Sequence, residues 1–300
     1  ASRNAQILVP APLPDNHSLP VTPFFALPDH AVIALEGVDA TAFAQAQFAN
    51  DVVALAPGYW QWNAWLTPKG RVIALFSLLK QSEDRLLLLV PDMDTEVMAT
   101  QMQRLVFRRK LKVEARSDLQ VSGAFTAPVT AGNARIGIVD EVIELDYGDA
   151  GQPRVLRIGP SINALLDIQA CLQWKQYDLL HGLVRLPPEQ REQWTPQQLS
   201  LERLPAFSVK KGCYPGQEIV ARTHFLGKAK RGLVVFESDA TIEAGMEVSD
   251  DERVVGSVIS VCSGETPLAL AVLPLDRPAG VLHAGEAALL EVALRSGLER

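Results

Sequence analysis

Apolar and polar residues alternate along the first half of the chain in short segments that predict a mixture of strands and helices. Period-two and short apolar runs predict strands at residues 31–36, 59–66, 71–80, 84–90 and 111–115. Helical spacing predicts helices at 39–50, after the N-cap residue Asp39, and at 92–108. Hairpin-like turns such as Pro68-Lys69-Gly70 separate the strands. This mixture favours the α+β class, with mixed, largely antiparallel sheets and helices.

The second half of the chain changes character at about residue 231. Before it, two short strands between 142 and 158 precede an amphipathic helix, which we expect to begin after Ser161 and to end near His181. After it, apolar segments predict a small C-terminal β-barrel or sandwich, with strands at 233–237, 247–250, 254–262, 268–273 and 287–293. The predicted domains are an extended Pro-rich arm at 1–28, a body at 29–230 that can divide into two subdomains near 120–140, and the barrel at 231–300.

Composition restricts the classes of function. The chain has 28 basic and 35 acidic residues and a net charge of −7, which disfavours direct nucleic-acid binding over a broad surface. It shows neither a membrane-spanning apolar stretch nor a secretory signal pattern, so we expect no membrane partner and a cytoplasmic location. Cys171, Cys213 and Cys262 lie far apart and form no zinc pattern, and the five histidines form no ligand motif, so no metal site is predicted. We expect Cys171 and Cys262 to be packing residues.

One segment, residues 208–231, concentrates positive charge around a cysteine. It contains six basic residues and one acid, Glu218. Pro215 suits the first turn of a helix, and Cys213 would lie just ahead of that turn, among lysines. Such surroundings lower the pKa of a thiol. The residues alone therefore predict a reactive or ligand-positioning thiol beside an anion-binding helix end, and the alternative is a packed cysteine below a solvated face of lysines.

The same segment resembles a known family. Lys211-Gly212-Cys213-Tyr214-Pro215-Gly216-Gln217-Glu218 is similar to the K-G-C-Y-x-G-Q-E signature of the YgfZ-type folate-binding proteins, which are relatives of the glycine-cleavage T-protein, an aminomethyltransferase. Ile219-Val220-Ala221-Arg222 and the basic turn at 227–231 extend the likeness, and weaker similarity at 37–51 and at Lys69-Gly70 carries it over roughly residues 27–293.

This resemblance implies a T-protein-like, folate-binding body with a C-terminal β-barrel. It also implies a function, as an accessory protein for assembly or repair of iron–sulfur enzymes, one of which thiomethylates tRNA. The implied cofactor is tetrahydrofolate or a derivative, and the implied partners are folate and iron–sulfur enzymes or cluster-assembly proteins. Cys213 would be the functional thiol. The cofactor-binding candidates would be Trp174, His30, Lys211, Arg222, Gln217 and Glu218.

The enzyme class is left open by the sequence. The T-protein places an aspartate against the folate on the strand after a G-G turn, and the matching residues here, 71–79, contain no carboxylate. Since folate-linked transfer needs a group that orients the amine, we predict folate binding without aminomethyl transfer. The alternatives are a tetrahydrofolate-dependent aminomethyltransferase with a carboxylate from another segment, and a tRNA-binding module that uses the basic residues 210–231.

Overall fold

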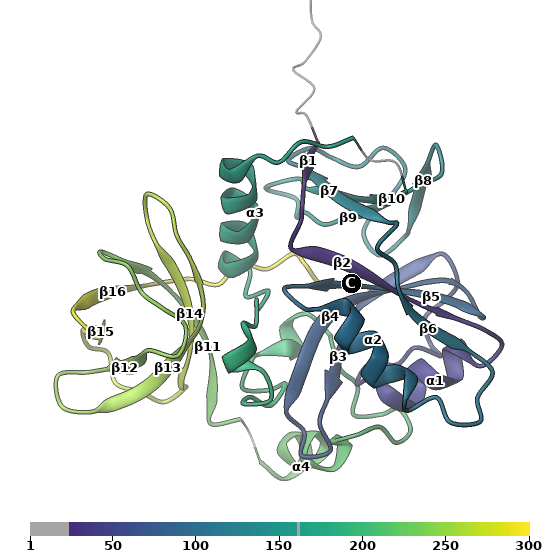
Figure 1. Cartoon of the computed structure of the whole chain (residues 1–300). Helices are drawn as coiled ribbons and strands as arrows, with labels where there is room; N and C mark the ends of the chain where they lie inside the picture. Colours follow the sequence, from purple (N-terminus) through teal and green to yellow (C-terminus); the bar gives the residue numbers. More distant parts are fainter. Residues whose placement is uncertain (1–23, 161–162, 228) are drawn as a thin grey trace, which may run out of the picture.

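The computed structural model describes residues 24–160, 163–227 and 229–300. Over these ranges it contains two five-stranded sheets, a closed six-stranded barrel and four α-helices (Figure 1). The predicted fold class, α+β with largely antiparallel sheets and a C-terminal barrel, is confirmed. Within the described ranges, no helix is long and apolar enough to span a membrane.

The first sheet is built by the hairpin-rich N-terminal half of the body. Its order is β3-β4-β5-β2-β6, with every neighbouring pair antiparallel. Its strands are β2 (His30–Glu36), β3 (Tyr59–Leu66), β4 (Val72–Ser82), β5 (Arg85–Pro91) and β6 (Lys112–Ala115). Helices α1 (Ala40–Gln47) and α2 (Thr95–Gln103) are both shorter than predicted. Alternate strand residues face opposite sides, so Ile33 and Leu35 pack with the two helices while Val32 and Ala34 face the central core.

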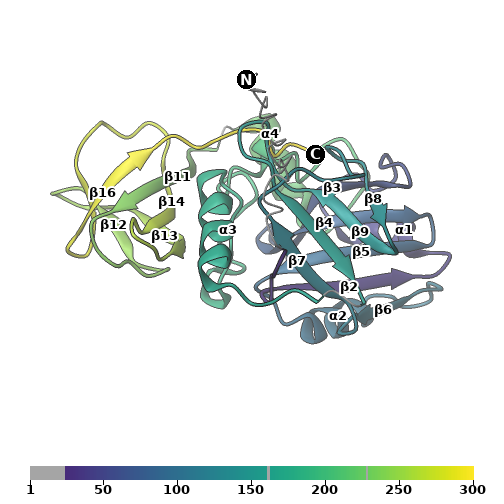
Figure 2. The ribbon, with the colours of Figure 1, turned by 90° about the horizontal axis from the view of Figure 1, so that it is seen from above.

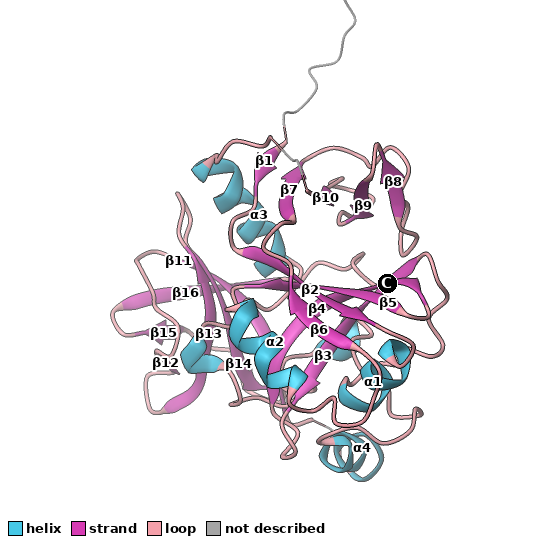
Figure 3. Cartoon of the chain, turned by 45° about the vertical axis from the view of Figure 1, so that its right-hand side comes forward, coloured by secondary structure: helices cyan, strands magenta, loops and turns pink. Residues whose placement is uncertain are grey.

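The second sheet and the helix α3 (Ile168–Leu180) lie across this central core (Figure 3). Its order is β1-β7-β10-β9-β8. Its strands are β1 (Phe25–Ala26), β7 (Gln120–Ala124), β8 (Gly137–Val139), β9 (Val142–Asp146) and β10 (Val155–Gly159). Strand β1 belongs to the range predicted as the arm, and most of that range, residues 1–23, lies outside the described residues. Ser161, the predicted N-cap, also lies outside them, and the cap of α3 is Asp167, whose side chain accepts a hydrogen bond from the Ala170 backbone.

The barrel begins at Arg231 and is closed by six strands, one more than predicted. They are β11 (Arg231–Ser238), β12 (Glu247–Ser249), β13 (Val254–Cys262), β14 (Leu268–Pro274), β15 (Leu282–Ala284) and β16 (Ala287–Val292). The last residues leave the barrel and return to the body (Figure 2). There the carbonyl of Leu298 accepts a 2.6 Å hydrogen bond from Trp62 Nε1, and Arg300 donates to the carbonyl of Gly148. The barrel is thereby tied to the body at both ends.

A buried ion-pair network crosses the central core. Arg185 is almost fully buried and pairs with Asp29, Asp92 and Asp178, and the buried Arg154 pairs with the other oxygen of Asp178 at 2.7 Å. Burial would raise the pKa of Asp29, but hydrogen bonding and charge from His30 and Arg185 lower it well below its ordinary range. Separating the partners of a buried ion pair leaves uncompensated charges and is strongly destabilising. These residues therefore fix how the sheets and α3 pack against one another.

We expect acid to loosen the contact between α3 and the β9–β10 turn. Asp149 in that turn accepts hydrogen bonds from Tyr177 of α3 and from His181, the C-cap residue of α3, at 2.6 and 2.7 Å. Burial raises the pKa of Asp149, but these bonds and two from backbone N–H groups lower it overall to about 2. Because the pKa of Asp149 is lower in the folded protein than in the unfolded chain, its ionisation stabilises the fold at pH values above 3.8. This stabilisation is lost as the pH falls from 3.8 towards 2. Urea unfolding should therefore show Asp149→Asn to be less stable than wild type at neutral pH, with the difference vanishing near pH 2. A constant difference at all pH values would contradict this assignment.

Candidate functional site

The turn between β3 and β4 packs against the cysteine motif through two glycines. Gly70 and Gly216 both have left-handed backbones, with φ of +72° and +81°. A Cβ atom on Gly216 would lie 2.6 Å from the Cα of Gly70, so only glycine permits this approach. The contact places Lys69 next to the motif and sets Gly216 as the N-cap of α4 (Gln217–Leu226).

Cys213 is exposed and lies in a surface hollow of about 480 Å³ at the start of α4. The hollow is lined by Pro68, Lys69, Cys213, Tyr214, Gly216, Gln217, Glu218 and Ile219. Three of the predicted site residues, Cys213, Gln217 and Glu218, therefore share one cavity, which opens on solvent. The hollow carries one cation, Lys69, and one carboxylate, Glu218, and lies at the N-terminal end of α4. A thiol placed in this way is presented to a partner, whereas a packing cysteine would be enclosed.

Lys211 does not face this hollow. It is buried, and its Nζ donates to the carbonyls of Gln45, Phe48 and Asn50 at 2.6, 2.5 and 2.9 Å. Burial lowers the pKa of Lys211 to about 8 against the opposing charge of Asp51. The three carbonyls match the three N–H donors of an ammonium group. Lys211 thus locks the chain after α1 beneath the motif, and a ligand could reach its amine only by displacing one of these carbonyls.

Lys211→Met should lower the free energy of unfolding by about 2–4 kcal/mol, because it leaves buried carbonyls without a donor. Lys210→Met provides the matched control, since the neighbouring Lys210 is exposed and its loss should change stability by less than about 0.5 kcal/mol. Urea unfolding of the two variants measures both values. Equal effects would show that the amine of Lys211 is not a structural clamp.

Arg222 lines a second hollow, of about 540 Å³, at the other end of α4. Its described lining carries four cations, Arg71, Arg222, Lys230 and Arg231, and no carboxylate. Lys228, which belongs to the predicted basic segment, lies outside the described residues. Beside this hollow α4 exposes Phe225 and Leu226, at 66% and 83% of their surfaces. The surface around α4 therefore combines apolar side chains with positive charge.

Trp174 and His30 lie in the central core and line neither of the α4 hollows. The guanidinium of Arg154 lies 4.0 Å from the ring centre of Trp174. His30 borders a small internal cavity of about 10 Å³, with Trp62, Tyr147, Asp178 and Arg185 among its other lining residues. The predicted site residues thus fall into a surface group at α4 and an internal group in the core, with Lys211 buried under the motif.

The internal group offers aromatic rings and polar atoms that suit a flat heterocycle such as a pterin, but the cavity beside it is too small to hold one. Among the described residues, two buried polar atoms lack a hydrogen-bond partner here: Trp174 Nε1 and Nη2 of Arg154, whose guanidinium packs on the Trp174 ring. Aromatic rings and the Asp178 carboxylate surround them. Ligands of this size need a cavity of roughly 300 Å³ or more. The residues therefore fit the group chemically, and binding requires the side chains around this cavity to move apart.

Comparison with known proteins adds independent evidence. No family model matches the chain. A protein of Haemophilus influenzae described only as uncharacterized is 27% identical, over 83% of this chain and 88% of its own length. The "tRNA-modifying protein YgfZ" of Photobacterium profundum is 27% identical, over 86% and 85%, and that of Colwellia psychrerythraea is 26% identical, over 83% of each chain.

The chain is similar to the YgfZ proteins over most of its length. The likeness inferred from the cysteine motif is thereby confirmed. The crystal structure of glycine cleavage system aminomethyltransferase T from Bartonella henselae matches with a TM-score of 0.65 at 14% identity, over 91% of this chain and 85% of that one. At this level of identity the match establishes the fold, which is T-protein-like as predicted.

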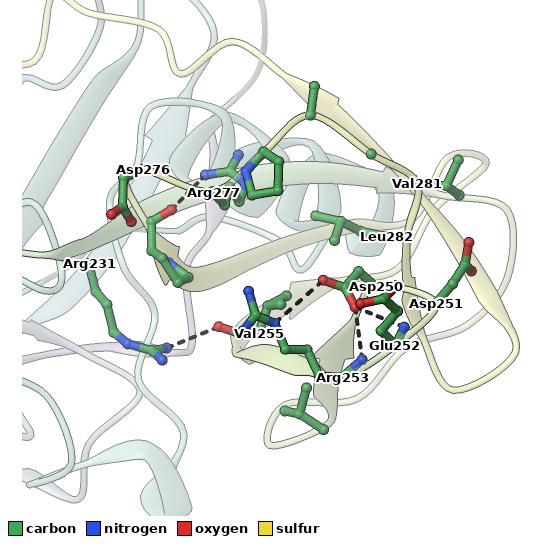
Figure 4. Close-up of a pocket in the computed structure, with 15 residues that line it drawn as sticks. Arg231, Asp250, Asp251, Glu252, Arg253, Val255, Asp276, Arg277, Val281 and Leu282 are labelled. Atoms are coloured by element: carbon green, nitrogen blue, oxygen red, sulfur yellow. Dashed lines mark hydrogen bonds and ion pairs between the residues drawn. The ribbon is translucent and has the colours of Figure 1, made fainter.

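Two other features lie outside the surface around α4. A hollow of about 620 Å³ on the barrel is lined by acids and arginines together (Figure 4). Arg253 pairs with Asp250 within this lining, and Arg277 pairs with Glu291, which lies outside it. The remaining cysteines pack: Cys262 is buried, and the thiol of Cys171 donates to the carbonyl of Ala26. In the described part of the chain, no group of three or more His, Cys, Asp or Glu side chains could hold a metal ion.

Proposed function

We propose that this protein is a folate-binding accessory protein that supports the assembly or repair of iron–sulfur enzymes and thereby influences tRNA modification. The observation that carries the proposal is the position of Cys213, exposed in a hollow and held on a rigid base by Lys211 and by the Gly70–Gly216 contact. The YgfZ relatives are named tRNA-modifying proteins, which supports the link to tRNA modification.

The thiol of Cys213 would act on a partner and not as a store of clusters. Common iron–sulfur clusters take four protein ligands, and no suitable group of ligands occurs in the described ranges. Contact with a cluster would therefore be transient or shared with the partner. The exposed Phe225 and Leu226 of α4, with the cations around Arg222, form a surface that suits a protein partner. The guanidinium of Arg222 could also bind a carboxylate of the partner or of the folate.

The pterin ring of tetrahydrofolate, or of a derivative, would bind in the core between the sheets. Trp174 does not line the closed cavity but stacks on Tyr147, which does; as the core opens, Trp174 would stack on the pterin and donate through Nε1, and His30 would lie at the edge of the cavity. When bound, tetrahydrofolate supplies a carrier for one-carbon groups. The chain does bring a carboxylate, Asp178, to this cavity from α3, but Arg154 and Arg185 bind both of its oxygens, so it is not free to orient a folate amine. We therefore propose binding without aminomethyl transfer.

The test pairs two assays. In bacterial cells that lack their YgfZ protein, expression of this chain should restore the activity of the tRNA-thiomethylating iron–sulfur enzyme. The purified protein should transfer no aminomethyl group to tetrahydrofolate. Turnover in the second assay would establish the aminomethyltransferase alternative, and failure to restore the enzyme in a strain that contains soluble protein would refute the accessory role.

A further inference from the structure

The loop between α2 and β6, residues 104–111, combines an exposed aromatic ring with unpaired cations. Phe107 is 90% exposed, although it stands beside the buried Val106. Its φ is +54°, in the left-handed region that bulky residues seldom adopt. A strained backbone that holds a phenylalanine in water is costly on both counts, and such outliers concentrate at functional positions.

The loop is held firmly, so the exposure of Phe107 is not a result of loose packing. The side chain of Asp39 accepts a 2.6 Å hydrogen bond from the Lys110 backbone N–H, and the carbonyl of Lys110 accepts one from Asp39 N at 3.3 Å. The backbone N–H of Arg109 donates to the carbonyl of Val106 at 3.0 Å. The backbone on the C-terminal side of Phe107 is thus fixed, so the position from which its ring projects into solvent is defined.

The charge of this region is opposite to that of the whole chain. Residues 97–113 contain five cations, Arg104, Arg108, Arg109, Lys110 and Lys112, and no acid, which leaves −7 − 5 = −12 for the rest. Lys112 pairs with Glu114, and Arg109 lies over the ring of Phe43. No described residue pairs with the side chains of Arg104, Arg108 or Lys110, all of which are exposed. Three exposed cations therefore lie within three positions of Phe107 in the chain.

We propose that the α2–β6 loop binds unpaired nucleotides of a nucleic acid, with the ring of Phe107 stacked on a base and the three free cations on neighbouring phosphates. A planar ring free on its faces stacks on any base, and flanking arginines hold the backbone. A membrane surface fits less well, because a single apolar tip gives little insertion energy. The net charge of the chain disfavours nucleic-acid binding over a broad surface, but the positive charge of this loop is concentrated in a few neighbouring residues.

The proposed surface is also connected to the cysteine motif. Asp39, which holds the loop, directly precedes α1, and the carbonyl of Gln45 near the other end of α1 accepts from Lys211. Helix α1 has 8 residues and is therefore roughly 12 Å long. A bound nucleic acid and a partner at Cys213 would therefore share one rigid element.

The test is fluorescence anisotropy with a synthetic RNA stem-loop that carries an unpaired loop, and with a blunt RNA duplex of equal length. Phe107→Ala should weaken stem-loop binding about tenfold and leave duplex binding unchanged, because only unpaired bases stack on the ring. Arg108→Gln should weaken the binding of both the stem-loop and the duplex. It should also reduce the slope of log affinity against log salt by the amount expected for about one phosphate contact. Wild-type affinity for the stem-loop should fall about 20-fold between about 50 and 200 mM salt, as three phosphate contacts require.

Phe225→Ala is the matched control, because Phe225 is another exposed phenylalanine beside basic residues. It should leave both affinities unchanged. The proposal is overturned if Phe225→Ala and not Phe107→Ala weakens binding, if the stem-loop does not bind at low salt, or if Phe107 proves necessary for binding to anionic lipid vesicles and not to RNA.

Discussion

Replacing Cys213 by serine should abolish the rescue of iron–sulfur enzyme activity in cells that lack the YgfZ protein, while leaving the fold and folate affinity intact. The side chain is exposed, so exchange of sulfur for oxygen disturbs no packing and should change the free energy of unfolding by less than about 0.5 kcal/mol. A serine hydroxyl neither ionises near neutral pH nor binds iron as a thiolate does. We expect the thiomethylated tRNA of the rescued strain to fall to the level of the unrescued strain, measured by mass spectrometry of digested tRNA.

Cys171→Ser and Cys262→Ser are the controls for this experiment. Both residues are at least partly enclosed, so their replacement tests stability, whereas neither side chain reaches the α4 surface hollow. These variants should restore tRNA thiomethylation whenever they accumulate as folded protein. Full rescue by Cys213→Ser would remove the thiol from the proposed function and leave the hollow as a docking surface only.

The apolar pattern predicted strands where short, largely apolar segments are bounded by turn residues. Strands β2 and β3 are such segments because both of their faces are buried, one against the cluster that contains the helices α1 and α2 and the other against the central core. The pattern failed where segments are short or end abruptly. Strand β15 has only three residues, too few to show a period. Helix α2 ends at Gln103 although buried Val106 continues its spacing, because the following turn holds Phe107 in a left-handed conformation.

The candidate site was predicted in part. The local motif indicated a functional cysteine and a nearby helix start, because both depend on neighbouring residues, but Pro215 lies before the N-cap Gly216 and not in the first turn of α4. The direction of the Lys211 side chain depends on carbonyls more than 160 positions away in the chain, and no local pattern indicates such a contact. The network of Arg154, Asp178 and Arg185 was missed entirely. Its only sequence signal is a charge enclosed by apolar residues, as in Tyr177-Asp178-Leu179 and Val184-Arg185-Leu186.

Trp174→Phe should distinguish the effect of Trp174 on the stability of the core from its effect on ligand binding. Trp174 Nε1 is buried and has no hydrogen-bond partner among the residues that the structure describes, and such a donor costs about 1–3 kcal/mol. Phenylalanine removes this cost but leaves a smaller ring, so the two effects offset each other and the free energy of unfolding should change by about 1 kcal/mol or less. If the donor is kept for a ligand, the same change should weaken tetrahydrofolate binding about tenfold, through one hydrogen bond and part of a stacking contact.

The control for this prediction is Trp65→Phe, because Trp65 is buried on the opposite face of β3, against the helices α1 and α2. It should lower stability and leave tetrahydrofolate affinity unchanged, both measured by calorimetry. The closed cavity adds a second expectation: binding must open about 10 Å³ to the size of a pterin, so ligand saturation should change the fluorescence of the core tryptophans in wild type. Unchanged affinity in Trp174→Phe would place the ligand elsewhere, and the hollow beside Cys213, with its volume of about 480 Å³, would then be the site to test through Gln217→Ala.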